Sequence, residues 1–455
     1  MIDTGAIKNS LIDMATTGLL TQGYIPTDVV SDILQDIPMV SSKRKKLLGQ
    51  EYEYGNKPVI PEHWIWVRLG EISTYGDTPQ KVMAADCDND TWILELEDIE
   101  AGGRLLIKKR VSQRQSKGEK TRFKTGQVLY SKLRPYLKKV LIADEDGVST
   151  PELISFDVLG GIRNKYILFC LLSSFTNRAI DKRSYGIKMP RVDSGFMANL
   201  PIPLPPLSEQ AIIVEKMEKA LFEIDCINGY QEKYSSDLEL LKSRLLEASL
   251  QGLLTEQMEN DGRAEDLIEQ LGLTENGVNP IDMDEIPYEI PDNWKWCRLS
   301  DIGTTNIGLT YHPEDVVDDG IFVVRSSNIL NGQMDYSDEV RVNCPIRENQ
   351  FLNKNDIVIC ARNGSKALVG KRAIYEGEPN TTSFGAFMAV FRTPFYKYVY
   401  YYLGSNVFRR YFSGDDSKQI NQVTQNILKN AIIPLPPKSE QKRITDLLDM
   451  INGIA

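Results

Sequence analysis

The sequence has few of the residues that most catalytic and metal sites need. Its 455 residues include only two histidines, His63 and His312, and six cysteines scattered without a C-x-x-C pair. Little material is left for a histidine-based acid–base site, and neither a zinc site nor a disulfide framework is suggested. The motifs G-x-G-x-x-G, Walker A and Asp/Asn/Ser-Pro-Pro-Tyr/Phe are also missing. We therefore expect the chain to catalyse no reaction and to bind no cofactor itself.

Long apolar runs are missing as well. No stretch approaches the ~20 apolar residues that a membrane-spanning helix needs. The first ten residues, MIDTGAIKNS, lack the basic and apolar segments of a signal peptide. With 42% apolar and 25% charged residues, the composition is that of an ordinary soluble protein. A cytoplasmic location is therefore expected.

The net charge of −10 hides an uneven distribution. Residues 256–292 hold twelve acidic residues and one arginine, so the rest of the chain sums to about +1. Within that remainder, residues 102–140 hold thirteen Lys and Arg residues against Glu119 alone. A basic segment of this length favours a nucleic-acid partner, although charged runs also occur on ordinary solvated surfaces.

The sequence repeats itself at an offset near 230 residues. The octet PLPPLSEQ at 203–210 recurs as PLPPKSEQ at 434–441, and IPEHWIWVRLGEI at 60–72 recurs as IPDNWKWCRLSDI at 290–302. A fixed offset of this kind indicates two copies of one structural unit. Such dense prolines are unsuited to helices and central strands. The Ser-Glu-Gln that follows predicts a helix start, with Ser208 and Ser439 as N-caps.

A third match indicates that one copy of the connecting helix is divided between the two termini. Residues 9–20 resemble 243–254, and residues 439–455 resemble the stretch that begins at 208. From Ile213 to Ala248, apolar residues advance by alternating fours and threes, and only Gln231 interrupts them. This pattern predicts a coiled coil. The partner helix would be the split copy, antiparallel to the first about a pseudo-twofold axis.

These patterns predict an α+β protein with an internal pseudo-twofold repeat, in which two mixed α/β globular domains are joined by long antiparallel coiled-coil helices. The expected order is a helical piece of the split spacer at 1–49, a first domain at 50–205, a central spacer helix at 206–255, an acidic helical or loop connector at 256–280, a second domain at 281–436 and the other helical piece at 437–455.

Two loops in each domain hold the candidate DNA contacts. The first follows a predicted buried strand, and the second precedes the proline-rich octet. Arginine can bind guanine or phosphate bidentately, Asn and Gln pair with adenine, and short hydroxyls suit phosphate. The candidates are Ser131, Lys132, Arg134, Tyr136, Lys138, Lys139, Lys188 and Arg191 in the first domain, and Arg362, Asn363, Ser365, Lys366, Lys371, Lys418, Gln419, Asn421 and Gln422 in the second. Because the interiors 77–120 and 305–350 show no clear identity, we expect one fold with two different reading surfaces.

The motifs W-x-W-x-R-L, GQVLYSKLRPYL, RNGSKALVGK, GIKMPRV and the repeated PLPP-x-SEQ resemble those of the specificity subunits of type I restriction–modification systems. The resemblance covers nearly the whole chain. It implies two target-recognition domains, each reading half of a bipartite double-stranded DNA site in the major groove, and helical spacers that set the gap. It also implies two methyltransferase subunits, which use S-adenosylmethionine, and restriction subunits, which use ATP and Mg as translocases and nucleases.

Two alternatives stay open from the sequence. The chain could be a fragment of a fused restriction–modification enzyme, which the missing methyltransferase and nuclease motifs disfavour. It could also be a purely structural coiled-coil adaptor, which would leave the basic segment 102–140 unexplained.

Overall fold

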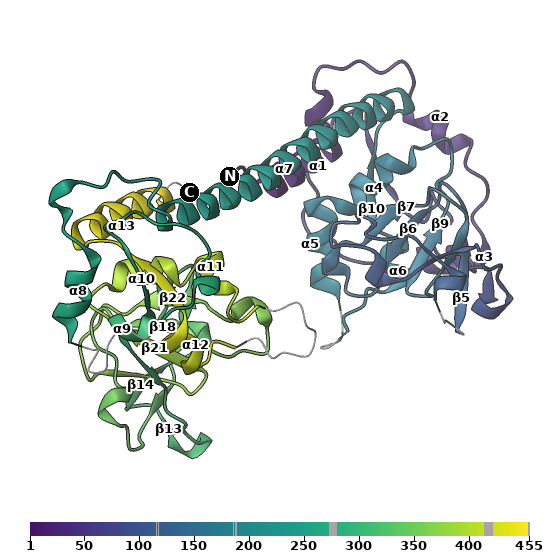
Figure 1. The fold of residues 1–455 in the computed structure, drawn as a ribbon. Helices are drawn as coiled ribbons and strands as arrows, with labels where there is room; N and C mark the ends of the chain where they lie inside the picture. Colours follow the sequence, from purple (N-terminus) through teal and green to yellow (C-terminus); the bar gives the residue numbers. More distant parts are fainter. Residues whose placement is uncertain are drawn as a thin grey trace. The chain divides into compact units, whose positions relative to one another are not determined.

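Two units make up the fold, Met1–Lys233 and Tyr234–Ala455 (Figure 1). A computed structural model describes residues 1–114, 116, 118–184, 186, 189–272, 280–413 and 422–453. The 44-residue helix α7 (Leu207–Leu250) begins in the first unit and ends in the second. Within the described ranges, no helix is both long and apolar enough to cross a membrane.

Each proline-rich octet begins as a strand of a two-stranded antiparallel sheet. β10 (Pro201–Leu204) pairs with β1 (Ile65–Arg68), and β22 (Ile432–Leu435) pairs with β11 (Lys295–Arg298). Proline is tolerated because each strand has only one neighbour, so its other edge needs no N–H donor. The W-x-W-x-R motif and the octet are thus partners in space, which explains why the two recur together.

The helices after the octets begin two residues earlier than expected. α7 begins at Leu207, and α13 (Lys438–Asn452) begins at Lys438, with Pro437 as its N-cap. Ser208 and Ser439 therefore lie inside the first helical turn, and the prediction that they are N-caps is wrong. The chain turns directly from the last proline into the helix, which suits the fixed φ of proline at a helix start.

The glutamate of each octet is buried against the tryptophan motif. A threonine hydroxyl and an indole N–H donate to the same carboxylate: Thr21 (2.6 Å) and Trp64 (2.9 Å) to Glu209, and Thr255 (2.7 Å) and Trp294 (2.8 Å) to Glu440. The exposed fractions are only 1% for Glu209 and 0% for Glu440. A carboxylate this deeply buried needs such donors to offset its lost hydration. These clusters connect each globular part to the helix that follows it.

The split partner helix is present as two separate pieces. In the first unit, α1 (Thr4–Thr16) runs antiparallel to the first half of α7, as Figure 1 shows. The Gln231 side chain both accepts from the Ile2 amide (2.6 Å) and donates to the Ile2 carbonyl (3.3 Å). In the second unit, α13 packs against the end of α7, with Leu448 and Leu246 in one apolar cluster. The predicted antiparallel arrangement is confirmed.

The apolar seam of α7 is buried near its beginning and open further along. Ile213 and Met217 are fully buried, whereas Tyr234 is 62% exposed and Leu241 is 52% exposed. The regular heptad pattern therefore does not correspond to uniform burial along the helix.

Besides the β1–β10 pair, the described residues of the first unit form two larger sheets. The five-stranded sheet has the order β2-β5-β8-β3-β4, and the three-stranded sheet has the order β7-β6-β9. The strands are β2 (Lys81–Met83), β3 (Trp92–Leu94), β4 (Lys109–Arg110), β5 (Glu119–Phe123), β6 (Val128–Ser131), β7 (Val140–Ile142), β8 (Gly147–Ser149) and β9 (Leu153–Phe156). The helices are α2 (Val30–Gln35), α3 (Ser42–Leu48), α4 (Asn164–Leu172), α5 (Ser174–Arg183) and α6 (Ser194–Ala198).

The second unit repeats this plan with one more pair of strands. Its four-stranded sheets have the orders β12-β21-β18-β19 and β13-β17-β14-β20, and β15 pairs with β16. The strands are β12 (Thr304–Ile307), β13 (Val316–Val317), β14 (Ile321–Val324), β15 (Ile329–Leu330), β16 (Gln333–Met334), β17 (Arg341–Val342), β18 (Ile357–Cys360), β19 (Arg372–Ile374), β20 (Thr382–Phe384) and β21 (Met388–Arg392). The helices are α8 (Ala264–Leu271), α9 (Leu299–Ile302), α10 (Tyr396–Tyr402), α11 (Asn406–Arg409) and α12 (Gln425–Asn430).

Strand registers make the two units equivalent. β6 lies antiparallel between β7 and β9, and β18 lies in the same way between β19 and β21. The parallel pair β3–β8 corresponds to β14–β20. All four residues of β6 and of β18 are buried, so these are the buried strands expected before the candidate loops. The predicted α+β fold with an internal repeat is confirmed.

Candidate nucleic-acid interface

The basic segment of the first unit is largely neutralised by the fold. Seven of its cations form ion pairs with carboxylates: Arg104, Lys108, Lys109, Arg110, Arg114, Lys120 and Lys132. Arg110 and Lys108, for example, lower the pKa of Glu145 to about 2. Most of these acidic partners lie outside residues 102–140, so counting charges along the segment overstated its free positive charge.

Five described cations of this segment make no ion pair with the described residues: Arg122, Lys124, Arg134, Lys138 and Lys139. Two of them, Arg134 and Lys138, flank the 3-10 turn Pro135–Leu137. Both have a left-handed backbone, with φ of 48° and 51°. Residues other than glycine rarely adopt this conformation, and where they do the site is often functional. The remaining charge is therefore concentrated beside the end of β6.

Three chain segments meet at this point in the first unit. The amide of Lys132 donates to the Glu152 carbonyl (3.1 Å), and the amide of Val192 donates to the Lys132 carbonyl (3.1 Å). The amide of Arg134 donates to the Pro190 carbonyl (2.7 Å). We call this meeting of 131–134, 150–153 and 190–192 the first junction. It brings together the two loops that the sequence nominated separately.

The second unit has the same backbone arrangement. The amide of Ala361 donates to the Phe387 carbonyl (2.9 Å), and the amide of Val423 donates to the Ala361 carbonyl (2.8 Å). We call this meeting of 360–363, 385–388 and 422–423 the second junction. The junctions match residue by residue, since Leu133 bridges to Arg191 and Arg362 bridges to Gln422.

The matched hydrogen bonds also identify which candidate residues are counterparts. Arg134 and Arg362 both follow a buried strand, but they are not counterparts. Arg362 takes the position of Leu133, which is 8% exposed, and Asn363 takes the position of Arg134. The two units therefore present their arginines from neighbouring positions of the same backbone.

Several first-unit candidates support the junction from inside. Ser131 is only 1% exposed, and its hydroxyl donates to the Leu133 carbonyl (2.8 Å), so the structure contradicts its prediction as a surface contact. The Lys139 ammonium donates to the Leu96 carbonyl (2.7 Å), which ties the loop to the neighbouring sheet. Tyr136 is 52% exposed on the intervening turn. Lys138 is half-buried beside it.

A shared carboxylate joins two other first-unit candidates. Arg191 binds Glu152 (2.8 Å), and the Lys132 ammonium lies 3.9 Å from the same side chain. The hydrogen bond from Arg191 lowers the pKa of Glu152, although partial burial opposes that shift. Glu152 therefore stays ionised and holds two cations together.

The second-unit candidates are mostly more open. Arg362, Ser365 and Lys366 are exposed, while Lys371 and Gln422 are half-buried. The Asn363 side chain donates to the Ser326 hydroxyl (3.0 Å) and accepts from the Ser365 amide (2.9 Å), which fixes the loop. Lys188, Lys418, Gln419 and Asn421 lie outside the described residues. Apart from Ser131, the candidate contacts stay predictions.

Sequence reasoning missed one segment of each junction. Glu152 and Phe387 lie in the turns β8–β9 and β20–β21, and both contribute a carbonyl to the junction. Neither residue stands near a basic or amide-rich stretch, and the two offer no shared motif. Only the strand registers identify them as counterparts, so no local signal could have nominated them.

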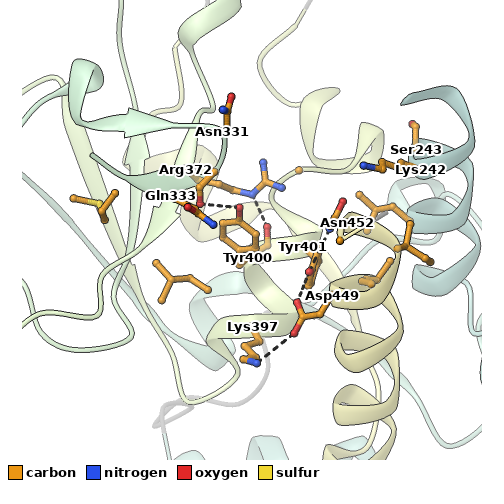
Figure 2. Close-up of a pocket in the computed structure, with 18 of the residues that line it drawn as sticks. Lys242, Ser243, Asn331, Gln333, Arg372, Lys397, Tyr400, Tyr401, Asp449 and Asn452 are labelled. Carbon is orange, nitrogen blue, oxygen red and sulfur yellow. Dashed lines mark hydrogen bonds and ion pairs between the residues drawn. The ribbon is translucent and has the colours of Figure 1, made fainter. Parts of the chain in front are cut away.

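A cavity of about 1660 Å³ lies elsewhere in the second unit, between α7, the β15–β16 hairpin, β19, α10 and α13 (Figure 2). On one side, the Arg372 guanidinium lies over the Tyr400 ring at 4.6 Å, and burial lowers its pKa. On the other side, Asp449 pairs with Lys397 (3.4 Å) and accepts from Tyr401 (2.5 Å). The cavity is separate from the candidate loops, although Arg372 follows Lys371 in sequence.

Comparisons with known proteins agree with the repeat. The sequence matches the family described as "Type I restriction modification DNA specificity domain" twice, over residues 61–233 and 291–453. Across 97% of its length the chain is 23% identical to the type I restriction enzyme EcoAI specificity subunit of Escherichia coli, covering 88% of that protein. Across 36% of its length it is 33% identical to the EcoKI specificity subunit of Escherichia coli (strain K12), covering 37% of that protein.

A solved structure shares the fold. It is described as "Structural basis underlying complex assembly and conformational transition of the type I R-M system". The match covers 86% of this chain and 91% of the other, with a TM-score of 0.61 at 21% identity.

Proposed function

Because the chain belongs to the family of type I restriction–modification specificity subunits, we propose that it supplies DNA sequence specificity to such a complex, with each unit reading one half of a divided site. The family match extends over both copies of the repeat, and two relatives of the same family are matched over 97% of this chain. This favours a specificity subunit over a fragment of a fused enzyme or a coiled-coil adaptor.

The single observation that carries the proposal is the repeated junction. Two of its backbone hydrogen bonds and one bridge recur in both units, but the side chains at five matched positions differ. The paired positions are Lys132 and Ala361, Leu133 and Arg362, Arg134 and Asn363, Glu152 and Phe387, and Arg191 and Gln422. A constant backbone with exchanged side chains is what two readers of different base sequences need, because base edges are distinguished by side-chain donors, acceptors and apolar groups.

The two junctions suit different base edges. The first offers Arg134 and Arg191, and arginine pairs best with guanine or phosphate. The second offers Arg362 beside the amides Asn363 and Gln422, and such amides pair best with adenine. We therefore propose that the two half-sites differ in sequence. The domains that read them would span residues 50–205 and 281–436.

We propose that catalysis belongs to partner subunits. Two methyltransferase subunits would dock along the spacer helices α1, α7 and α13 and bring S-adenosylmethionine. Restriction subunits would bring the ATP- and Mg-dependent activities. The family match supports this division of labour, as does the solved relative, whose description concerns complex assembly in a type I system. Because its proposed substrate is cellular DNA, the chain would act in the cytoplasm.

Exchange of one domain tests the proposal directly. Residues 50–205 are replaced by the matching domain of a relative, and methylated sites are mapped in cells that express the chain with its partners. We expect one half-site to change while the other half and the gap stay the same. A change in both halves, or in neither, would contradict independent reading by the two units. The matched control is the same exchange over residues 281–436, which should change the other half.

Lengthening α7 tests its role as a spacer. Seven residues inserted after Leu238 preserve the heptad register and extend the helix by about 10 Å. Because B-DNA rises about 3.4 Å per base pair, we expect the mapped gap to lengthen by about one to three base pairs. Bending or slippage against the unextended partner pieces accounts for the lower value. An unchanged gap in an active complex would show that the helix does not measure the DNA.

A further inference from the structure

The turn before β9 in the first unit occupies the same place as the turn before β21 in the second unit. In the first unit, the Thr150 amide donates to the Leu94 carbonyl (3.2 Å) and the Leu153 amide to the Thr150 carbonyl (3.0 Å). In the second unit, the Gly385 amide donates to the Val324 carbonyl (3.0 Å), and the Met388 amide donates to the Gly385 carbonyl (2.8 Å). These bonds fix Glu152 and Phe387 as counterparts at the tip of the turn.

Phe387 is a large apolar side chain on the surface of the second junction. It is 63% exposed, and it is absent from the apolar clusters of the described residues. Single exposed apolar residues are common, so exposure alone indicates nothing. The position of Phe387 is what singles it out, because its carbonyl accepts from the amides of both Ala361 (2.9 Å) and Arg362 (3.0 Å). Phe387 therefore lies directly beside Arg362 in the second junction.

The ring also orients the neighbouring arginine. The Arg362 guanidinium carbon lies 5.9 Å from the centre of the Phe387 ring, and no described carboxylate pairs with it. An arginine held against an aromatic face keeps its donors free to point outward. The second junction therefore presents an apolar surface and a bidentate cation side by side.

We propose that Phe387 is a specificity-determining residue that contacts the 5-methyl group of a thymine in the half-site read by the second unit. This inference rests on the proposed function. The thymine methyl is the apolar group that the major groove presents, and phenylalanine is one of the side chains suited to contact it. Since base pairs rise about 3.4 Å, the 5.9 Å between ring and guanidinium places the methyl within about two base pairs of the group that Arg362 binds.

Glu152 takes a different role at the equivalent position. Its carboxylate is 26% exposed and is bound to Arg191 and close to Lys132, so it is a positioning residue for those cations. The turn of the second unit thus contributes an apolar side chain to contact a base, and the turn of the first unit contributes a carboxylate that positions two cations.

The test uses the full chain with its methyltransferase partners and duplexes carrying the mapped site. Each thymine of the second unit's half-site is replaced singly by deoxyuridine, which lacks only the methyl group. With the parent chain, we expect one replacement to weaken binding about fourfold, the factor that corresponds to burial of one methyl group. With Phe387→Ala, we expect weaker binding to the thymine duplex and no further loss at that position. Phe387→Leu should retain part of the sensitivity.

Glu152→Gln is the matched control, because it should alter binding at the first unit's half-site and leave the deoxyuridine sensitivity unchanged. The proposal is overturned if the parent chain is insensitive to every replacement, if that half-site contains no thymine, or if Phe387→Ala binds as the parent does. A failure of the proposed function is distinguishable, since the parent complex would then bind the mapped site no better than a scrambled duplex. Because Phe387 is exposed, an unchanged thermal midpoint checks that the variant is folded.

Discussion

The first and second units share their buried polar contacts and differ in their exposed side chains. Glu209 and Glu440 accept from the same kinds of donors, and the hydroxyls of Tyr166 and Tyr398 both donate to the carbonyl of the first proline of the octet (2.5 Å in each). At the junctions, by contrast, the backbone is kept and the side chains are exchanged. Buried polar groups lose stability when a partner is changed, whereas exposed positions can change with little loss. The comparison therefore separates residues that hold the fold from residues free to specialise.

A second difference lies inside the molecule, at the cavity of the second unit. Arg372, Tyr400 and Gly404 surround one side of it, and a Cβ on Gly404 would overlap the Arg372 guanidinium. Strand register and the matched helix contacts assign Val140, Leu168 and Leu172 to these positions in the first unit. The first unit is thus apolar where the second holds a half-buried cation.

The largest effect is expected at the shared glutamates. Glu440→Ala leaves the Trp294 and Thr255 donors without an acceptor in a dry environment, and we expect a loss of about 3 kcal/mol in the free energy of unfolding. Glu209→Ala should have a similar cost if the clusters are equivalent. Urea denaturation of the full chain measures both. Glu223→Ala, on the exposed face of α7, is the control and should change little. A large loss of unfolding free energy for only one of the two glutamates would show that the two clusters are not equivalent.

A smaller effect is expected at Gly404. Gly404→Leu gives the second unit the residue of the first, and the added side chain must displace Arg372 at a cost of about 2 kcal/mol. The triple variant Arg372→Val, Tyr400→Leu, Gly404→Leu restores the apolar set of the first unit and should recover part of this loss. Gly229→Ala, where a Cβ meets nothing within 4 Å, serves as the control. An equal loss in the single and triple variants would contradict the assigned equivalence.

The smallest effect in energy is expected at Arg134. Arg134→Asn places the second unit's residue in the first junction, and asparagine tolerates the left-handed backbone better than arginine does. We expect DNA binding about tenfold weaker, as for loss of one bidentate base contact, with no loss of thermal stability. Binding at graded salt concentrations measures the first effect. Arg104→Ala, which removes an arginine already paired with Glu100, should bind DNA almost as the parent does.

Much of this fold could be predicted from the sequence because its buried elements recur. The octets and the heptad pattern each reflect a local requirement, so they located α7 and the split partner helix correctly. The pairing of the tryptophan motif with the octet as two strands was found only in the structure. The N-caps were misplaced by two residues, because the fixed φ of Pro206 and Pro437 already suits a helix start without help from a serine.

The candidate site was predicted only in part. The loops after β6 and β18 and those before the octets were identified from the sequence, but that they meet at the junctions was found only in the structure. Ser131 is buried, however, and Arg134 and Arg362, which both follow a buried strand, occupy neighbouring rather than equivalent positions. Seven cations of the basic segment are paired with carboxylates, most of them supplied by other parts of the chain, and proximity in sequence does not indicate such pairing.

The sequence by itself determined the repeat, the two globular units, the connecting helix and its division between the termini, because periodicity and proline placement act over a few residues. Only the tertiary structure decided which side chains share a surface. Glu152 reaches Arg191 across 39 positions of chain, and Phe387 lies beside Arg362 because one turn donates its carbonyl to a distant loop. Strand register sets these meetings, and register depends on backbone hydrogen bonds between segments that carry no common motif.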